Sequence, residues 1–421
     1  MKKVTLKTTL SLAVALASSQ VLASGFALNE QSISGMGLGF AGRSSAADDA
    51  STVYGNPAGM SLLKREQVTG GVAAIDASTD ISDTRGRGNS TNKGDMVPFT
   101  AVPMGFYVKP IDDHWAFGVG VYAPFGLITD YESTFQGRNF GSKSEVQVIA
   151  FQPTVSYAFN DRVSIGFGPT INHISGKLES AFNLSTALPR DGEVRIKGDD
   201  IGYGFNVGLL VQATDTTRVG LTYHSKVKYK LEGHTTVTAQ PLTPIPGGRY
   251  DATLDIETPE SADFSVTQDL TDAWKLYAGA TWTGWSRLKD ITVNNKGVAG
   301  AQPQLLFGTI SEEQNWHDTW AYALGTSYQL NKQWVLRTGL TFDQSPTNNT
   351  DRSPRIPTGD RKIFSVGAGW SPTDDLTIDV AYSYLKEEKV SINRTNRLGQ
   401  FYSAEYENSA NGFGIGATYR F

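Results

Sequence analysis

The sequence has no cysteine in its 421 residues, so disulfide bonds cannot stabilise its fold. It also lacks any apolar run close to the roughly 20 residues that a membrane-spanning helix needs. Hydrophobic residues make up only 39%, and the formal net charge of −5 gives no general case for nucleic-acid binding. These absences exclude a disulfide-rich secreted domain, a helical membrane protein and a strongly basic nucleic-acid-binding protein.

The chain instead has an export signal and many glycines and aromatics. Lysines at its start, an apolar stretch over 10–17 and the small residues of 21–23 predict a secretory signal peptide over residues 1–23. The chain contains 44 Gly, 17 Tyr and 20 Phe. Together with export and the absence of cysteine, this composition is typical of a bacterial outer-membrane β-barrel. A secreted soluble β-protein stays open on composition alone.

Alternating hydrophobicity alone fits both classes, and the length of the alternating stretches together with the export signal favours the barrel. In LTIDVAYSYL (376–385) and IGYGFNVGLLVQ (201–212), large apolar residues alternate with mainly small or polar ones. Alternation over ten or more residues is long for a soluble strand and suits a strand that crosses a bilayer at a tilt. We therefore expect large side chains to face lipid and small ones to face a lumen.

Short and long polar links alternate between these strands. Short turns such as KPIDDH (109–114) and FNDR (159–162) are rich in Asn, Asp, Pro and Thr, whereas segments such as 76–97 and 177–198 are longer. Counting through this alternation predicts an all-β, 14-stranded antiparallel transmembrane β-barrel over residues 66–421. The even number places both ends of the barrel on the periplasmic side of a Gram-negative outer membrane.

The last strand, GFGIGATYRF, alternates to the terminal Phe421. We expect this aromatic residue to engage the barrel assembly machinery, and we expect outer-membrane lipids and lipopolysaccharide to surround the finished barrel. Nucleic acid is not an expected partner.

Residues 24–65 differ from the rest because they are rich in Gly, Ala, Ser and Asp and do not alternate. A barrel of fourteen strands has a bore too wide to be filled by the side chains of its own wall. We therefore expect this segment to be a plug, or hatch, inside the lumen.

The segment GFALNEQSISGMGLGFAGRSSAADDASTVYGNPAGMS (25–61) closely resembles the hatch of the FadL family of long-chain fatty acid outer-membrane transporters. The resemblance resumes at TWTGWSRLKD (281–290), WVLRTGLTFDQSPT (334–347) and RIPTGDRKIFSVGAGW (355–370). It implies a fourteen-stranded barrel, which agrees with the count above. It also implies that Asn56, Pro57 and Ala58 lie beside the hydrophobic tail of a bound ligand. A simple proline-containing turn is the structural alternative for this tripeptide.

The third strand, WAFGVGVYAPFGLITDY (115–131), contains Pro124 and Gly126 on either side of Phe125. Proline removes a ladder hydrogen bond and commonly marks a kink or bulge, although the strand could simply end here. The resemblance implies a kink that opens a lateral gap through which substrate leaves into the bilayer. Pro124 and Gly126 are thus gating candidates, and Phe125 is a ligand-binding candidate.

Two polar links carry apolar residues that would suit substrate capture. One has Leu178, Phe182, Leu184 and Leu188 at roughly helical spacing, and the other has Val237, Leu242 and Ile245. Packing beneath the loops is the structural alternative, whereas the resemblance implies a groove that first binds fatty acid. The candidate partners for a carboxylate are Lys177, Arg337, Arg355 and Arg361, although each could instead pair with Asp or Glu.

The sequence does not predict enzyme activity, a cofactor or a metal. Gly37-x-Gly39-x-x-Gly42 matches a dinucleotide-binding fingerprint but lacks the strand and helix that this motif requires. Histidines at 114, 173, 224, 234 and 317 show no metal-ligand spacing, and no serine–histidine–acid grouping is recognisable. We predict passive transport of long-chain fatty acids or similar hydrophobic compounds. The alternatives are a channel of the same fold for aromatic or alkane hydrocarbons, a general porin, and an adhesin or phage receptor.

Overall fold

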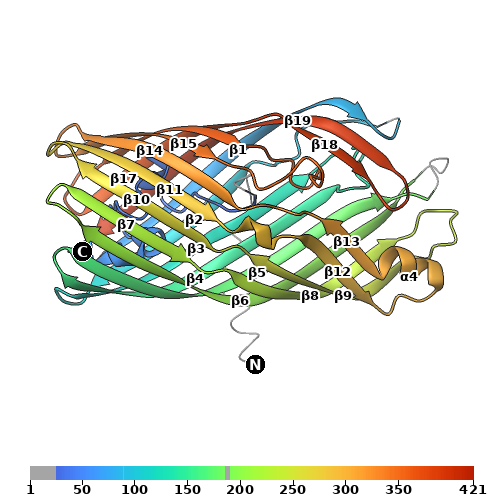
Figure 1. Cartoon of the computed structure of the whole chain (residues 1–421), viewed down its shortest axis with the longest axis horizontal. Helices are drawn as coiled ribbons and strands as arrows, with labels where there is room; N and C mark the ends of the chain where they lie inside the picture. Colours follow the sequence, from blue (N-terminus) through green and yellow to red (C-terminus); the bar gives the residue numbers. More distant parts are fainter. Residues whose placement is uncertain (1–24, 89, 185–189) are drawn as a thin grey trace.

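The structure, a computed structural model, describes residues 25–88, 90–184 and 190–421. Figure 1 shows a long barrel of tilted strands, with α4 near one end and the C-terminus near the other. The helical elements are α2 (Ile33–Gly37), α3 (Thr52–Gly55), η1 (Pro57–Leu62), η2 (Trp285–Arg287) and α4 (Ala301–Phe307). The strand segments are β1 (Gln67–Arg85), β2 (Thr100–Pro110), β3 (Trp115–Asp130), β4 (Lys143–Asn160), β5 (Val163–Phe182), β6 (Gly192–Gln212), β7 (Thr217–His224), β8 (Val227–Thr238), β9 (Gly248–Thr258), β10 (Ser261–Asp269), β11 (Trp274–Thr283), β12 (Asp290–Lys296), β13 (Thr309–Glu313), β14 (Thr319–Gln329), β15 (Trp334–Asp343), β16 (Arg361–Trp370), β17 (Leu376–Glu387), β18 (Val390–Thr395) and β19 (Phe401–Arg420).

These segments of the described chain form a closed barrel of fourteen crossings. Several crossings consist of two segments each, namely β7 with β8, β9 with β10, β11 with β12, β13 with β14, and β17 with β18. Sequential neighbours pair antiparallel, and β19 pairs with β1 from Gln67–Arg420 onward, which closes the sheet. Closure satisfies the backbone hydrogen bonds that an open edge would leave unpaired in lipid. The predicted 14-stranded antiparallel barrel is confirmed.

The predicted alternation of strand faces is also confirmed. In β6, Tyr203, Phe205, Val207 and Leu209 are exposed on the outside of the barrel, whereas Asn206 between them is buried. The same pattern places large apolar side chains outward on β14 and β17. This arrangement is that of a wall whose outer face meets lipid. No helix among the described residues is long and apolar enough to span a membrane.

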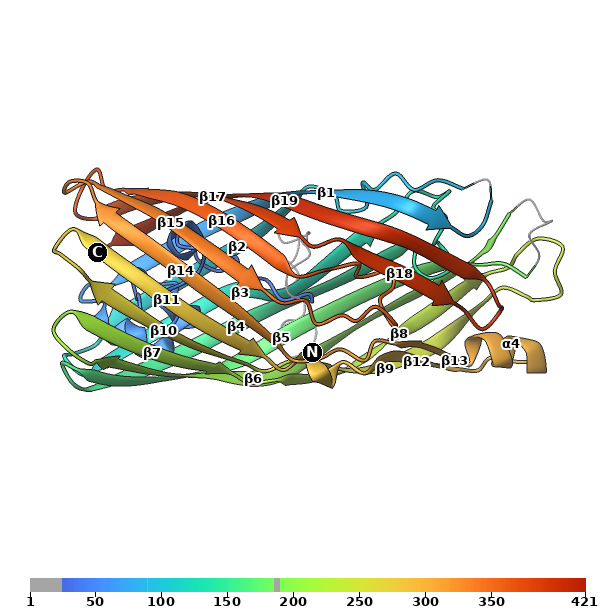
Figure 2. The same cartoon turned by 45° about the horizontal axis from the view of Figure 1, so that its top comes forward.

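The wall extends further than the sequence predicted at the end that carries α4. Segments that were expected to be loops are part of the strands. For example, β1 runs to Arg85 and β5 runs to Phe182. Figure 2 shows β18, β19 and the end of β1 reaching toward this same end. The helical spacing proposed for Leu178 to Leu188 was wrong as far as Phe182, because the chain is a strand there. Leu188 lies outside the described residues. Strands outside the lipid have no uniformly apolar face, so their periodicity was not recognisable.

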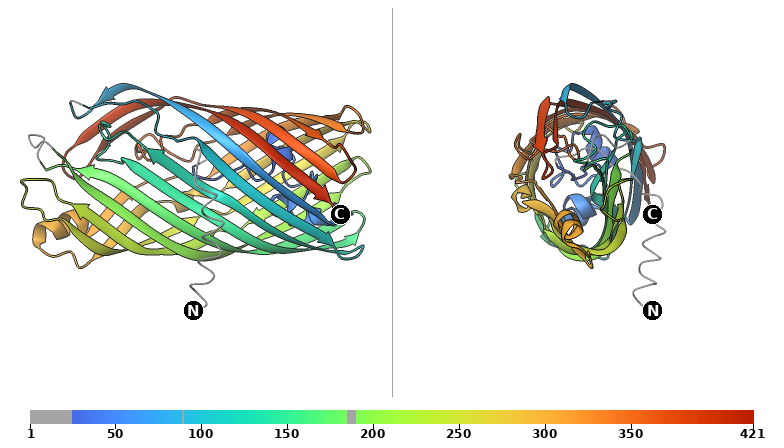
Figure 3. Two further views of the ribbon diagram at one scale, coloured as in Figure 1. Left: turned by 180° about the vertical axis from the view of Figure 1, so that it is seen from behind. Right: turned by 90° about the vertical axis from the view of Figure 1, so that its right-hand side faces the viewer.

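The segment from Gly25 to Arg65 lies against the inner face of the wall, and Figure 3 shows it inside the ring of strands in the end-on view. Ser44 and Ser45 bond to β10 through Ser265 at 2.9 Å and Thr267 at 2.8 Å. On the other side, Thr341 of β15 donates to the Gly39 carbonyl at 2.7 Å.

The wall is glycine-rich where this segment touches it. A side chain at Gly208 would overlap Asn56, one at Gly220 would overlap the Ser44 backbone, and one at Gly339 would overlap the Leu38 backbone. Lumen-facing glycines therefore let the backbone of the N-terminal segment approach the sheet closely.

Candidate functional site

An apolar cluster occupies the end of the barrel that carries α4. Its buried members come from β5, β6, β8, α4 and the β8–β9 link, and Phe182 and Phe307 meet with ring centroids 5.3 Å apart. Exposed leucines are found in α4 and in the β5–β6 and β8–β9 links: Leu184 is 38% exposed, Leu242 88% and Leu305 76%. Such exposure is costly in water and marks a surface able to bind an apolar ligand. The cluster consists of Phe182, Val194, Val237, Ile245 and Phe307.

An apolar cavity lies further along the inner wall. Ile196 connects the two features, since it packs against the outer cluster and also lines the cavity. Nearly all of the residues that line the cavity are aliphatic, which suits a hydrocarbon chain. The lining comprises Val146, Ile174, Gly176, Leu178, Ile196, Lys197, Gly198, Leu231, Gly233, Ala252, Thr253, Leu254, Ile256, Ile291 and Val293.

Four aromatic side chains lie beyond this cavity. Phe26 of the N-terminal segment contacts Trp285 at 4.8 Å and Phe125 of β3 at 5.8 Å between ring centroids. Trp285 in turn contacts Trp316 at 5.1 Å. Phe125 also packs against the buried residues beside the apolar cavity, so it joins the cavity to this aromatic group.

The third crossing is irregular where the sequence placed its kink. The β3–β4 register shifts between Tyr122 and Phe125, and the β2–β3 ladder ends at the pair Gly105–Val121. The N-terminal segment pairs with β3 beyond this point. Leu28 N donates to Pro124 O at 2.9 Å, and Gly126 N donates to Phe26 O at 2.7 Å. The chain's own N-terminal segment thus satisfies the backbone of β3 at the irregularity.

A second and larger cavity lies between the N-terminal segment and the wall. Its lining includes Phe125 and Pro124 at the kink, so the irregular part of β3 borders this space directly. Polar residues line another part of it, among them Arg43, Tyr54 and His224. This cavity combines an aromatic part with a polar part.

Arg43 is the cation of this polar part. Its guanidinium donates to Asn29 Oδ1 at 2.7 Å and lies over the Phe40 ring, 5.4 Å from the centroid. Tyr54 stacks edge-on against Tyr122 at 4.9 Å and lies 4.8 Å from the His224 ring. Burial raises the pKa of the Tyr54 hydroxyl, so this group stays protonated as a donor.

Glu30 lies in the same segment. Burial raises the pKa of its carboxyl, whereas hydrogen bonding to the backbone and the positive charges of Arg361 and Arg43 act in the opposite direction. Burial therefore favours the neutral form of the Glu30 carboxyl over its charged form. Arg43 is left as a cation that no carboxylate of the described chain neutralises by a direct ion pair.

Asn56 is the N-cap of η1, and Pro57 and Ala58 are its first two residues. All three lie outside the lining of both cavities. Asn56 Nδ2 donates to Ser44 O at 2.7 Å and Leu209 O at 3.0 Å, and its Oδ1 accepts from Ala58 N at 3.0 Å. The tripeptide caps η1 and attaches the N-terminal segment to β5 and β6. Tyr54, two residues earlier, borders the larger cavity instead.

The candidate cations of the sequence are all engaged with acidic side chains. Lys177 pairs with Glu179 at 2.7 Å, and Arg337 pairs with Asp379 at 2.6 Å. None of the four candidate cations lines either cavity. Sequence reasoning missed Arg43, although one signal was present: it is the only Lys or Arg between Gly25 and Leu63. Among the described residues, no three His, Asp or Glu side chains form a group that could hold a metal.

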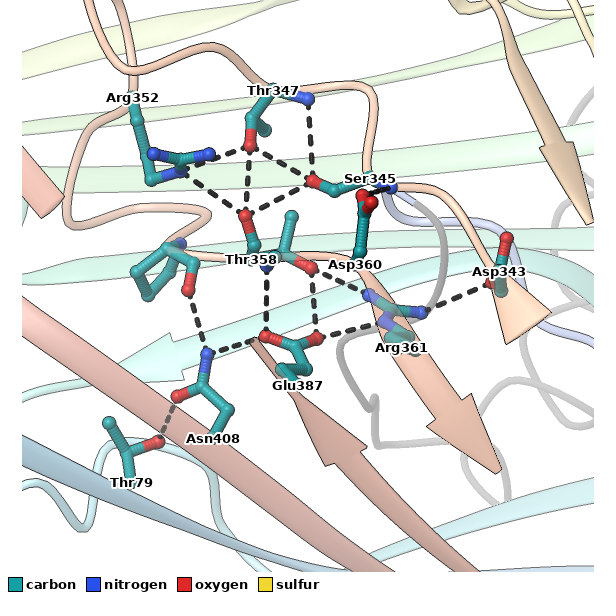
Figure 4. A network of polar contacts seen from close by, with 12 residues as sticks. Thr79, Asp343, Ser345, Thr347, Arg352, Thr358, Asp360, Arg361, Glu387 and Asn408 are labelled. Atoms are coloured by element: carbon teal, nitrogen blue, oxygen red, sulfur yellow. Dashed lines mark hydrogen bonds and ion pairs between the residues drawn. The ribbon is translucent and has the colours of Figure 1, made fainter. Parts of the chain in front are cut away.

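Arg361 belongs to a buried polar network, shown in Figure 4. It pairs with Glu387 at 2.8 Å and with Asp343 at 3.7 Å. Glu387 also accepts from Thr358 at 2.9 Å and from Asn408 at 2.7 Å. This network joins four wall strands, β15, β16, β17 and β19, to the link between β15 and β16.

That link, residues 344–360, runs across the bore to the opposite wall. Arg355 donates to Lys143 O at 3.1 Å and Ser144 Oγ at 3.0 Å, and it pairs with Glu312 at 3.0 Å. Tyr131 donates to Pro354 O at 2.7 Å. Since β15 and β16 are the eleventh and twelfth crossings and β3 to β5 the third to fifth, the link joins opposite sides of the ring. It narrows the lumen on the outer side of the aromatic group.

Replacing Arg361 tests the role of the network. Arg361→Met is expected to lower the free energy of unfolding by about 3–5 kcal/mol, because Glu387 would remain buried without its partner. Urea titration of the barrel in lipid vesicles measures this change. Lys362→Met is the matched control, since Lys362 is exposed and lies 3.5 Å from the exposed Glu388. Equal stability of the two variants would contradict a stabilising role for the network.

Comparison with known proteins places these features in context. Residues 14–421 match the family model described as outer membrane protein transport protein (OMPP1/FadL/TodX). A long-chain fatty acid transport protein of Escherichia coli O6:H1 is 31% identical over 449 residues, covering 99% of this chain and 98% of that protein. A Pseudomonas aeruginosa FadL homologue is similar in structure, with a TM-score of 0.84, 28% identity, and coverage of 94% and 99%. The Pseudomonas putida toluene transporter TodX has a TM-score of 0.71 at 17% identity, with coverage of 95% and 100%, which concerns the fold alone.

Proposed function

The chain belongs to the FadL family of outer-membrane transport proteins, and on this premise we propose that it carries long-chain fatty acids across the outer membrane of a Gram-negative bacterium. The observation that supports this most directly is the apolar route along one side of the lumen. It begins at the exposed leucines, continues through the aliphatic cavity and reaches Phe125 at the kink.

In the proposed mechanism, capture begins at the outer apolar cluster. Leu184 and Phe182, which the sequence indicated, contribute to this surface together with Leu242 and Leu305. A bound chain then enters the aliphatic cavity, where each methylene removed from water contributes about 0.8 kcal/mol. The link 344–360 narrows the bore and directs the chain along the wall formed by β4 to β12.

Release takes place sideways at β3. The N-terminal segment, residues 24–65, acts as the hatch, and its residues Phe26 to Leu28 cover the irregular part of β3. When these residues withdraw, the space next to Pro124 and Gly126 connects the larger cavity with the bilayer. A fatty acid that slides out here never exposes its whole chain to water, which favours this route over axial release. Asn56, Pro57 and Ala58 hold the rest of the hatch on β5 and β6 while its N-terminus moves.

Uptake of radiolabelled oleate tests this function. A Gram-negative host that lacks its own fatty acid transporter is expected to take up oleate only when it expresses this chain, and the accumulated label measures the rate. An empty vector is the control. If toluene uptake rises and oleate uptake does not, the protein serves uncharged hydrocarbons, and if both stay at background the proposal fails.

A further inference from the structure

Three hydrogen-bond donors without a charged partner border the larger cavity. Arg43 forms no ion pair within the described part of the chain; its contacts are with Asn29 and the Phe40 ring. The hydroxyl of the half-buried Tyr54 forms no hydrogen bond with the described residues, and Nε2 of His224 is buried without a hydrogen-bond partner. Buried polar groups are usually paired, so the unpaired Nε2 of His224, on the same cavity as a guanidinium without a carboxylate partner, indicates a ligand that would complete the site.

The chemistry of the three groups selects a small anion. A guanidinium binds a carboxylate through charge-assisted hydrogen bonds, and a phenol adds a neutral donor. The His224 ring can donate from Nε2 in the appropriate tautomer. Asp343 and Asp263 also line the cavity, but Asp343 pairs with Arg361 and Asp263 accepts from Thr281 at 2.6 Å.

The same cavity offers an apolar path away from this end. Phe40, Ala27, Tyr122 and Phe125 line it between Arg43 and the irregular part of β3. We infer that Arg43, Tyr54 and His224 bind the carboxylate of the transported amphiphile, while its tail lies toward Phe125. This inference rests on the proposed function and adds to it the residues that recognise the head group. The head group would be held by the hatch itself, and the tail would point at the lateral exit.

Binding of oleate and of oleyl alcohol to the purified full-length protein tests this assignment. The two ligands share the apolar tail and differ in charge, so their affinity ratio isolates the head group. The wild type is expected to prefer oleate by about tenfold or more, because hydrogen bonds to charged groups are the strong ones. Arg43→Gln is expected to lose this preference and to bind oleyl alcohol as before, whereas Arg43→Lys should retain part of the preference. Arg162→Gln, on the exposed turn between β4 and β5, is the matched control.

The outcomes separate this inference from the proposed function. If the wild type binds neither ligand and takes up no oleate, the proposed function fails. If it binds both and Arg43→Gln keeps the full preference for oleate, only the assignment of Arg43 is overturned. Tyr54→Phe keeps the ring contacts with Tyr122 and removes only the hydroxyl, so it decides the matter if Arg43→Gln does not form a barrel. A reduced oleate preference in Tyr54→Phe supports the site, and an unchanged preference overturns it.

Discussion

A variant with Ala27→Cys and Phe125→Cys is expected to lose oleate uptake almost completely when oxidised and to regain it on reduction. The two residues face each other as a bridge between the N-terminal segment and β3. Flanking bonds run from Leu28 N to Pro124 O and from Gly126 N to Phe26 O, which makes this a non-hydrogen-bonded antiparallel pair. Such pairs have Cα atoms about 4.5 Å apart, within the range that a disulfide spans.

The chain has no other cysteine, so the introduced pair can form only one intramolecular disulfide. Each single variant, under the same oxidant, controls for loss of the Phe125 ring and for oxidation of the cells. Uptake is measured with and without a reductant. If the oxidised double variant transports oleate as fast as its reduced form, the N-terminal segment does not have to leave β3, and lateral release at this position is wrong.

Deletion of residues 25–63 is expected to turn a nearly non-conducting barrel into an open channel. The bore of a barrel this wide is not filled by its own wall, and the wall facing this segment is lined by glycines such as Gly208, Gly220 and Gly339. Ohmic conductance in planar bilayers measures the change, with the wild type prepared in the same way as control. Mobility of unheated protein in gel electrophoresis checks that the deleted chain forms a barrel.

A milder change guards against failure of the deletion variant to fold. Gly339→Val would overlap the Leu38 backbone, so it is expected to displace the hatch and raise conductance to an intermediate level. If the wild type conducts salt as freely as the deletion variant, the N-terminal segment does not close the bore, and the general-porin alternative gains support.

The alternation of large apolar and small residues was sufficient to predict the strands of the membrane-spanning wall. Large side chains such as Tyr203 and Leu209 alternate with small ones because one face meets lipid and the other meets the lumen. The irregularity at Pro124 could be predicted for a similar local reason, since proline interrupts the hydrogen-bond ladder of a strand wherever it occurs. The outer extensions of the strands, such as the end of β1, could not be predicted from alternation, because neither face of the sheet meets lipid there.

Only part of the candidate site could be predicted from the sequence. Phe125 could be found because it follows the proline of an interrupted strand. The cations could not be ranked, because whether an arginine has a carboxylate partner depends on residues far away in the chain. Arg361 meets Glu387 across 26 positions, and Arg355 meets Glu312 across 43. Arg43 stood out in the sequence only as a lone basic residue, which by itself predicts no role.

The sequence by itself determined that the chain is exported, that its wall has fourteen strands and that a small-residue segment precedes them. Each of these is a local or periodic property, set by which side chains can face lipid, water or a tight turn. Only the tertiary structure decided which cations stay unpaired, where the link 344–360 crosses the bore, and how Phe26 to Leu28 cover β3. These depend on contacts between segments up to hundreds of residues apart, whose free energy is set by distance and burial rather than by neighbours in the chain.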